Sequence, residues 1–190
     1  MPQDVFEEYA DDYDRWFDDH HDEYLAELAR IRRVLPLPDS RAIEVGVGSG
    51  RFAGPLGIGL GIEPSRALGR MARQRGIEIV RGRAEALPFK DRSCSSVLMV
   101  TVICYLDNPA KAIQEMQRVL LPQGTLAIGF IEREGRIARR YLEEKGKHRF
   151  LSRARFSSRD EVLGYLSDTG FRLLHVESQA GFCVIASQKV

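Results

Sequence analysis

Ala42-Ile43-Glu44-Val45-Gly46-Val47-Gly48-Ser49-Gly50 is the stretch of sequence that decides the fold. Its first four residues predict a short apolar strand, and the glycines that follow end this strand. Glycine adopts positive φ without strain and lets a ligand approach the backbone closely. Exposed amides at the start of a following helix favour an anionic group such as a carboxylate. The stretch therefore predicts a ligand-binding loop between a strand and a helix.

The spacing of the glycines separates this loop from the dinucleotide-binding fingerprint. That fingerprint requires G-x-G-x-x-G, so a third glycine would follow Gly46 and Gly48 at position 51. Arg51 stands there, and the third glycine comes at Gly50 instead. The pattern is E-x-G-x-G-x-G, with the carboxylate of Glu44 two residues before the first glycine.

Strands and helices alternate along the rest of the chain. Short apolar runs predict strands over residues 58–62, 77–80, 96–102, 125–131, 172–176 and 182–187. Helical spacing and capping residues predict helices over residues 65–75, 108–120 and 158–170. Two of the strands are apolar on both faces, as in parallel sheets that helices cover on both sides. This order predicts a doubly wound α/β sheet.

Two amphipathic helices are expected before the first strand. Aromatic residues recur at helical spacing at Phe6, Tyr9, Tyr13 and Trp16, and aliphatic residues do so at Leu25, Leu28, Ile31 and Leu35. The prolines at positions 36 and 38 end the second helix. The aromatic face has two compatible interpretations, which are core packing and a cover over a bound ligand.

A second carboxylate stands at the end of the next strand, in Gly61-Ile62-Glu63-Pro64-Ser65. The end of the second strand lies beside the loop of the first strand, at the switch point of a doubly wound sheet. Glu63 can therefore accept hydrogen bonds from two neighbouring hydroxyl groups of a ligand bound at that loop.

At these residues the sequence resembles the class I S-adenosylmethionine-dependent methyltransferases, in the type 11 subgroup that acts on small molecules. Further matches follow in the same order, Gly82-Arg83-Ala84-Glu85-Ala86-Leu87-Pro88-Phe89 and Leu120-Leu121-Pro122-Gln123-Gly124-Thr125-Leu126. The resemblance runs from about residue 9 to residue 171. It departs from the family pattern at Arg83 and Ser95, where aspartate is common.

The resemblance implies a set of cofactor-binding residues. Glu44 would contact the ammonium group of the methionine moiety, often through water, and the loop residues Gly46, Val47, Gly48 and Gly50 would wrap that moiety. Glu63 would accept both ribose hydroxyls, and Pro64 would pack on adenine. The Ala84 amide and the Glu85 carboxylate would serve adenine where Arg83 replaces the usual acceptor. Thr101 would lie near the methyl group.

The resemblance also implies an architecture. We expect one Rossmann-like domain over residues 1–190, whose seven-stranded sheet is mostly parallel with the last strand antiparallel. Residues 1–38 would form a helical lid, residues 39–131 the cofactor-binding core, residues 132–157 a substrate-side insertion, and residues 158–190 the last helix and two strands.

The implied reaction is transfer of a methyl group from S-adenosylmethionine to a small-molecule acceptor, giving S-adenosylhomocysteine. Because the sulfonium donor is already activated, the protein mainly has to orient two reactants. A base matters only for an acceptor that must lose a proton, and the candidates are Tyr13, Tyr105 and His148. For His148 a solvent-facing position is the alternative. No metal site is expected, since His20 and His21 lie on an acidic helix without further histidine or cysteine nearby.

Charge is balanced overall and uneven along the chain. The 28 Lys+Arg residues nearly cancel the 27 Asp+Glu residues, which disfavours a generic nucleic-acid binder. Residues 1–29 are acidic, whereas residues 133–159 are basic and include Arg139, Arg140, Lys145 and Lys147. As a hypothesis, the basic stretch attracts an anionic acceptor. The longest uncharged apolar run covers residues 93–106, which is shorter than a membrane span of about 20 residues.

Three cysteines without short spacing disfavour a disulfide framework and predict a cytoplasmic protein. Two other function classes stay open. One is a non-catalytic cofactor-binding or scaffold protein with the same fold, and the other is an NAD(P)-dependent oxidoreductase. The sequence carries no code for the acceptor, the use of a base, the effect of Arg83 or the oligomeric state.

Overall fold

A central sheet of seven strands organises the computed structural model, which describes residues 3–144 and 148–190. The strands are Ala42–Val45 (β1), Leu60–Ile62 (β2), Glu78–Val80 (β3), Cys94–Val100 (β4), Leu120–Ile131 (β5), Phe171–Gln179 (β6) and Phe182–Lys189 (β7). Their order across the sheet is β3-β2-β1-β4-β5-β7-β6. β7 is antiparallel to both of its neighbours, and the other pairs are parallel. The predicted Rossmann-like sheet is confirmed.

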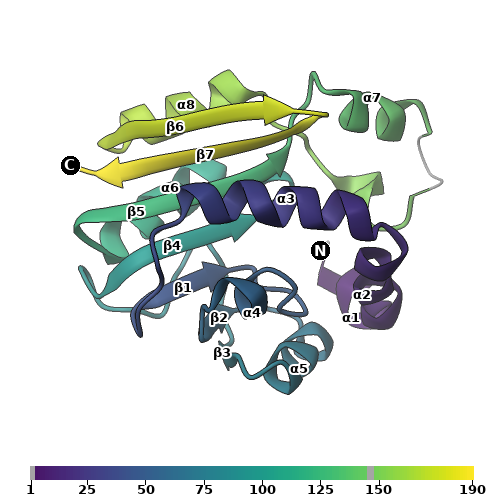
Figure 1. Cartoon of the computed structure of the whole chain (residues 1–190), viewed down its shortest axis with the longest axis horizontal. Helices are drawn as coiled ribbons and strands as arrows, with labels where there is room; N and C mark the ends of the chain where they lie inside the picture. Colours follow the sequence, from purple (N-terminus) through teal and green to yellow (C-terminus); the bar gives the residue numbers. More distant parts are fainter. Residues whose placement is uncertain (1–2, 145–147) are drawn as a thin grey trace.

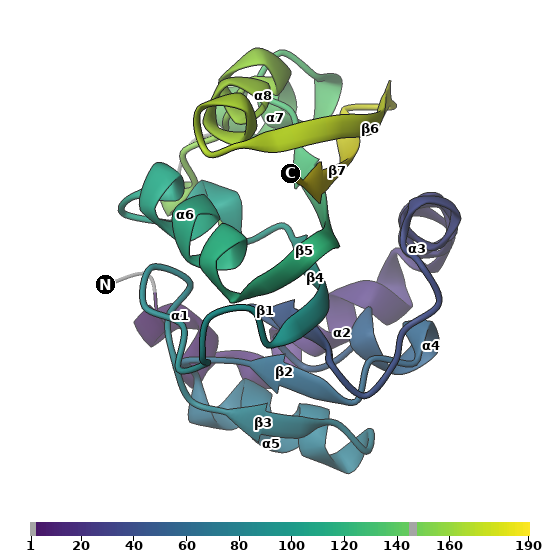
Figure 2. The same cartoon turned by 90° about the vertical axis from the view of Figure 1, so that its left-hand side faces the viewer.

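Helices cover both faces of the sheet (Figures 1 and 2). They are Gln3–Glu8 (α1), Ala10–Asp19 (α2), His21–Val34 (α3), Ala53–Leu56 (α4), Arg66–Gln74 (α5), Pro109–Val119 (α6), Arg136–Glu143 (α7) and Arg159–Asp168 (α8). Short 3₁₀ turns occur at Ile103–Tyr105 and Leu151–Arg153. Within the described residues, no helix combines the length and the apolar character needed to cross a membrane.

The alternating side chains of the central strands divide the core into two layers. Val97 and Met99 of β4 face a cluster that contains Ile113 of α6 and Val162 of α8. The neighbouring β4 residues Leu98 and Val100 face a second cluster that contains residues of α2, α3, α4 and α5. Because both faces are buried, β4 and β5 read as almost continuous apolar runs.

The capping signals in the sequence mark helix starts accurately. Asn108 accepts a hydrogen bond from the Lys111 amide in front of α6. Ser158 and Glu161 form the reciprocal capping box in front of α8. Each cap satisfies amides that the helix itself leaves without a partner.

The N-terminal region differs from the expected pair of helices. Three helices precede β1, with breaks at Tyr9 and His20, and neither residue makes a side-chain capping hydrogen bond. α3 runs along the sheet, whereas α1 and α2 lie at the carboxyl ends of the strands (Figure 1). Neither break carries a local capping signal, which explains why the helical spacing of the sequence did not reveal them.

Two other elements have unexpected lengths. The helix after the glycine loop, α4, is only four residues long. β5 begins at Leu120 and includes the segment expected as a turn, in which Gln123 has φ of 65°. The positive φ of Gln123 bends β5 at this point, so the expected turn forms a bend within the strand.

Candidate functional site

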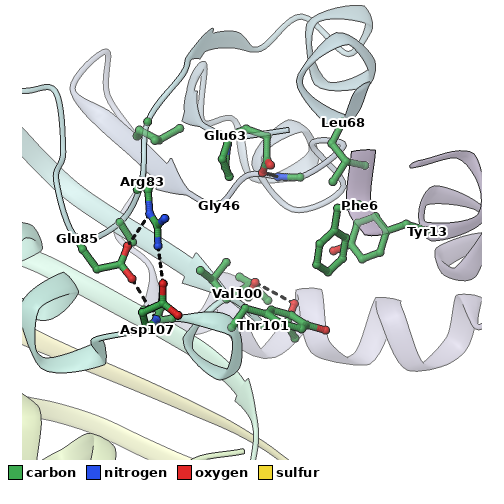
Figure 3. A pocket seen from close by; sticks show the side chains of 18 residues that line it. Phe6, Tyr13, Gly46, Glu63, Leu68, Arg83, Glu85, Val100, Thr101 and Asp107 are labelled. Carbon is green, nitrogen blue, oxygen red and sulfur yellow. Dashed lines mark hydrogen bonds and ion pairs between the residues drawn. The ribbon is translucent and has the colours of Figure 1, made fainter. Parts of the chain in front are cut away.

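A pocket opens at the carboxyl ends of β1, β2 and β4 (Figure 3). It holds about 810 Å³ of space outside the protein atoms, part of it open to solvent. The lining residues are Phe6, Tyr13, Gly46, Gly48, Ile62, Glu63, Pro64, Leu68, Gly82, Arg83, Ala84, Glu85, Val100, Thr101, Val102, Tyr105, Leu106 and Asp107. The position is the switch point at which doubly wound sheets bind ligands.

The glycine loop contributes backbone to this pocket. Gly46 and Gly48 both line it, with φ of 71° and 56°. A Cβ on Gly46 would overlap the side chain of Val102, and one on Gly48 would lie 3.5 Å from the Tyr13 ring. Glycine is thus required at position 46 by both conformation and space, and the loop backbone stays open to a ligand.

Other members of the loop face away from the pocket. Val47 is buried against Gly61 and belongs to the core, and Gly50 packs against Ala72 and Ile77. Neither residue is among those that line the pocket. In the described contacts, Val47 and Gly50 pack the loop against β2 and α5.

Glu63 is the buried carboxylate of the pocket, with 5% of its surface exposed. Its Oε2 accepts a hydrogen bond of 2.9 Å from the Gly48 amide, and its Oε1 accepts one of 2.9 Å from the Ser65 amide. Burial raises the pKa of Glu63 to about 7, although these amides act in the opposite direction. Each oxygen retains a lone pair, so the carboxylate can accept further hydrogen bonds from a ligand.

Glu44 lies deeper than the pocket surface. It is 1% exposed, and within the described residues its Oε2 has no hydrogen-bond partner. Burial raises its pKa well above the ordinary value, an effect that the Ala53 amide partly opposes. An unsatisfied buried carboxylate oxygen is costly, so a donor that reaches it would be bound favourably.

The third loop brings a charged network to one side of the pocket (Figure 3). Arg83 forms an ion pair of 2.9 Å with Asp107, and its Nε lies 3.6 Å from Glu85. Oε1 of Glu85 accepts a hydrogen bond of 3.2 Å from the Asp107 amide. Glu85 and Ala84 both line the pocket, as does Asp107, which the sequence analysis did not single out. In the sequence, Asp107 is marked only by its position directly before Asn108, the residue that caps α6.

Aromatic rings form the opposite wall. Phe6 of α1 makes edge contacts with Tyr13 and Tyr105, at ring-centre distances of 5.3 and 5.2 Å. Phe150 packs against Phe6 at 5.6 Å and against Tyr13 at 5.5 Å. The N-terminal helices and the segment around Phe150, which are far apart in the chain, therefore meet over the pocket. Helical spacing indicated Phe6, whereas nothing in the sequence indicated Phe150.

The two candidate tyrosine bases have hydroxyls that burial keeps protonated. Burial raises the pKa of Tyr13, and nearby Glu63 and Glu44 raise it further. Burial also raises the pKa of Tyr105 well above its ordinary value, and the Tyr105 hydroxyl donates to the Phe150 carbonyl at 3.3 Å. Both side chains can orient a ligand, but neither is suited to removing a proton near neutral pH. Thr101 also lines the pocket, in a left-handed conformation with φ of 52°.

The third candidate base lies elsewhere. His148 hydrogen-bonds to Glu144 and contacts the edge of the Tyr141 ring, with a ring-centre distance of 4.3 Å. It is not among the residues that line the pocket. The structure thus brings Tyr13 and Tyr105 to the site and leaves His148 outside it.

The basic stretch also lies outside the pocket. Arg133 pairs with Glu161, Arg140 with Glu144, and Arg149 with Asp12, and Arg139 donates to the Glu134 carbonyl. None of these arginines lines the pocket. Lys145 and Lys147 are outside the residues that the structure describes.

Arg51, the residue that broke the dinucleotide pattern, ties α2 to the glycine loop. Its guanidinium forms ion pairs of 2.7 Å with both Asp14 and Asp18, and Arg75 pairs with Asp14 at 2.9 Å. Partial burial acts to raise the pKa of Asp14, but the hydrogen bonds from Arg51 and Arg75 lower it to about 2. The helix that carries Tyr13 is therefore fixed to the loop that carries Gly48.

Known proteins resemble this chain over most of its length. Residues 43–128 match the family model of the type 11 methyltransferase domain. An uncharacterized protein of Methanocaldococcus jannaschii is 39% identical over 168 residues, which cover 88% of this chain and 81% of that protein. An uncharacterized protein of Mycobacterium tuberculosis is 34% identical over 166 residues, and the match covers 85% of this chain and 58% of the longer relative.

A solved structure agrees with these sequence matches. It is the crystal structure of a SAM-dependent methyltransferase of Thermotoga maritima, a possible histamine N-methyltransferase. It superposes with a TM-score of 0.92 at 35% identity and covers 100% of both chains. The superposition covers the N-terminal helices as well as the sheet. From these matches we conclude that the chain belongs to the class I S-adenosylmethionine-dependent methyltransferases, in the type 11 group.

Proposed function

We propose that this protein binds S-adenosylmethionine in the pocket at the carboxyl ends of β1, β2 and β4. Its reaction is transfer of the methyl group to a small-molecule acceptor, which leaves S-adenosylhomocysteine. The observation that carries the proposal is the buried Glu63 carboxylate, held by the Gly48 and Ser65 amides at the floor of an open pocket. The family membership of the chain supports the same reaction.

The residues of the pocket fit this cofactor. Glu63 offers free lone pairs to a pair of ribose hydroxyls. Glu44 does not line the pocket, but its buried Oε2 offers an acceptor that an ammonium group would reach through water. Pro64 and Leu68 supply apolar surface beside Glu63 for a flat adenine ring. Gly46 and Gly48 leave room for the ligand at the loop backbone. Ala84 and Glu85 lie on the side where the adenine edge would be recognised, and Thr101 lies at the end of β4.

When bound, the cofactor supplies a methyl group that its sulfonium already activates. The task of the chain is orientation, which can contribute about 7–11 kcal/mol when two reactants are held in line. Glu63 and the glycine loop fix the donor side. The rings of Phe6, Tyr13 and Tyr105 exclude water and position the acceptor side. The Tyr13 hydroxyl acts as a hydrogen-bond donor to the acceptor, whereas the Tyr105 hydroxyl already donates to the Phe150 carbonyl.

We further propose that residues 1–38 act as a helical lid over the cofactor-binding core, residues 39–131. The α1 and α2 helices supply Phe6 and Tyr13 to the pocket, and Arg51 holds α2 to the loop. Residues 132–157 would form the acceptor side, because Phe150 closes over the same rings. Residues 158–190, with α8, β6 and β7, would complete a single domain.

Histamine is the acceptor that we would test first. The Thermotoga maritima relative is a possible histamine N-methyltransferase, and three carboxylates but one guanidinium line the pocket of this chain. An anionic acceptor stays a prediction without support from the pocket, since none of the arginines described in the basic stretch lines it. We place the reaction in the cytoplasm, because all three cysteines are buried and none is in a disulfide.

The test is a methyl-transfer assay with labelled S-adenosylmethionine and a panel of amines, carboxylates and phenols. We expect formation of S-adenosylhomocysteine that depends on an acceptor and falls at least 30-fold in Glu63→Ala, which removes the proposed ribose acceptor. The matched control is Glu78→Ala, an exposed carboxylate on β3. Binding of S-adenosylmethionine without turnover of any acceptor on the panel would favour a non-catalytic scaffold protein. Tight binding of NAD alone would contradict the proposal.

A further inference from the structure

A second hollow lies on the outer side of α5, beside the edge strand β3, away from the pocket described above. It holds about 910 Å³ of space outside the protein atoms, part of it open to solvent. Its lining residues are Glu7, Ser65, Arg66, Gly69, Arg70, Arg73, Ile79 and Arg81. We refer to it as the arginine groove. Figure 2 shows α5 and β3 together at the end of the sheet opposite β6.

The arginines of this groove come from two elements and converge. Arg66, Arg70 and Arg73 follow one another at helical spacing along one face of α5. Arg81 comes from the segment after β3, and its Nη2 donates to the Pro64 carbonyl at 3.1 Å. Nη2 of Arg73 likewise donates to the Ile79 carbonyl at 3.1 Å. Two guanidinium groups are thus held in place by backbone carbonyls, with further N–H groups left to donate.

Among the described residues, the other two guanidinium groups form no ion pair, although the charge of Arg70 helps to lower the pKa of Glu7. No hydrogen bond or ion pair of the Arg66 or Arg70 side chain occurs within residues 3–144 and 148–190, and both residues are exposed. Elsewhere most arginines of the same chain are paired, for example Arg51, Arg118 and Arg149. The groove therefore concentrates positive charge that the fold itself does not neutralise.

Glu7, the one carboxylate among the described residues that line the groove, already has hydrogen-bond donors. Oε2 of Glu7 accepts from the Ser65 hydroxyl at 2.7 Å and from the Ala67 amide at 3.1 Å, and these hydrogen bonds lower its pKa. Glu7 thus caps the start of α5 and leaves four guanidinium groups facing one carboxylate. Guanidinium groups repel one another at short range, and an anion bound among them relieves this repulsion.

We propose that the arginine groove binds a compact ligand that carries at least two phosphate groups. Guanidinium forks match phosphate oxygens, and several converging forks are needed because a single exposed ion pair contributes little. A long nucleic acid is a poorer match. Among the described residues that line the groove, none is aromatic, so no side chain offers a surface on which a base could stack.

The experiment is calorimetric titration with inorganic tripolyphosphate at 50 and 300 mM salt. The test variant is Arg66→Gln/Arg70→Gln, and the matched control is Arg136→Gln/Arg140→Gln, which removes two exposed arginines at the same spacing from α7. We expect the test variant to bind tripolyphosphate at least tenfold more weakly than wild type at 50 mM salt, and the control to change less than twofold. Higher salt should weaken wild-type binding, since exposed charges are screened.

Three results would overturn the proposal. They are absence of tripolyphosphate binding to wild type at millimolar concentration, equal weakening by the test and control variants, and tighter binding of a single-stranded oligonucleotide than of tripolyphosphate. Titration with S-adenosylhomocysteine separates the groove from the pocket. The test variant should bind that compound as wild type does, which also shows that the variant is folded.

Discussion

Glu63 is the pocket carboxylate whose titration the fold changes. A glutamate in the unfolded chain titrates near 4.5, whereas burial raises the pKa of Glu63 in the folded chain to about 7. Between these pH values the folded chain keeps a proton that the unfolded chain has lost. The contribution of Glu63 to stability is therefore fully present below about pH 4.5 and is lost as the pH rises through about 7.

This linkage predicts a pH-dependent difference between wild type and Glu63→Gln. We expect the free energy of unfolding of the ligand-free wild type to fall more steeply between pH 5 and pH 8, by on the order of 3 kcal/mol. Glutamine cannot titrate, so the variant should lack this part of the slope whatever its absolute stability. Urea unfolding at several pH values measures the free energy of unfolding of wild type and of the variant. Identical slopes for the two proteins would show that Glu63 is not held at a raised pKa.

Arg51 carries a second prediction at the residue scale. Its side chain and that of Asp14 are 17% and 16% exposed, and Asp18 binds the same guanidinium. Arg51→Ala leaves Asp14 without this donor, and hydrogen bonds to charged groups contribute about 1.5–3 kcal/mol each. We expect a loss of about 2–3 kcal/mol in urea unfolding, and weaker docking of α2 on the glycine loop.

The control for Arg51 is Arg15→Ala. Arg15 forms a more exposed ion pair with Asp12 on the same helix, and such pairs contribute about 0–1 kcal/mol. A loss of stability in Arg15→Ala as large as that in Arg51→Ala would mean that burial does not set the strength of the Arg51 contacts.

At the scale of elements, α2 and the segment around Arg149 meet over the pocket. Arg149 pairs with Asp12 at 2.8 Å, and its guanidinium carbon lies 3.7 Å from the centre of the Tyr9 ring. Next to this contact, Phe150 packs on Phe6 and Tyr13. We infer that these contacts slow the release of a ligand from the pocket.

Arg149→Ala should therefore raise the dissociation rate of S-adenosylhomocysteine about 2–5-fold, as loss of one exposed pair and one cation–π contact implies. Asp12→Ala should have a smaller effect, because the contact with Tyr9 remains, and the double variant should show less than the summed effect. Stopped-flow displacement measures the rates. Arg133→Ala, which breaks a pair of similar exposure with Glu161, is the control. Equal acceleration by the control would contradict the inference.

The elements that the sequence predicted well are those whose signal is local. The β4 strand is apolar on both faces, and the α6 and α8 helices begin at capping residues whose hydrogen bonds the structure contains. The breaks at Tyr9 and His20 have no such signal, since no side chain caps the helices that follow. Tertiary contacts between α1, α2 and the pocket decide them.

The same distinction applies to the candidate site. Gly46, Gly48 and Glu63 follow strands directly, so the order of elements placed them at one edge of the sheet. The contacts between Arg83 and Asp107 and between Phe6 and Phe150 join separate segments of the chain, and no local pattern encodes them. His148 shows the converse case, because its chemistry suggested a base while its neighbours Glu144 and Tyr141 hold it outside the pocket.

At the scale of the whole molecule, the acidic stretch (residues 1–29) contacts the basic stretch (residues 133–159). Asp12 and Arg149 belong to these two stretches, and their ion pair lies beside the aromatic wall of the pocket. A ligand that fills the pocket touches the N-terminal helices, the glycine loop and the end of β4 at once. Binding should therefore stabilise the chain as a unit.

S-adenosylhomocysteine at 100 times its dissociation constant should add about 2.7 kcal/mol to the free energy of unfolding. For a chain of 190 residues this corresponds to a rise of roughly 5–10 °C in Tm. Thermal unfolding with and without the ligand measures the shift, and NAD at the same concentration should produce none. A shift confined to part of the unfolding transition would contradict binding across these elements.

The central claim is that Glu63 and the glycine loop form a site for the adenosyl cofactor, and calorimetric titration with S-adenosylhomocysteine tests it most directly. Wild type should bind one equivalent, and Glu63→Ala should bind about 30-fold or more weakly, since about 2 kcal/mol or more is lost with a charged hydrogen-bond acceptor. Glu78→Ala should bind as wild type does. Absence of binding to wild type, or equal affinity of wild type and Glu63→Ala, would contradict the account.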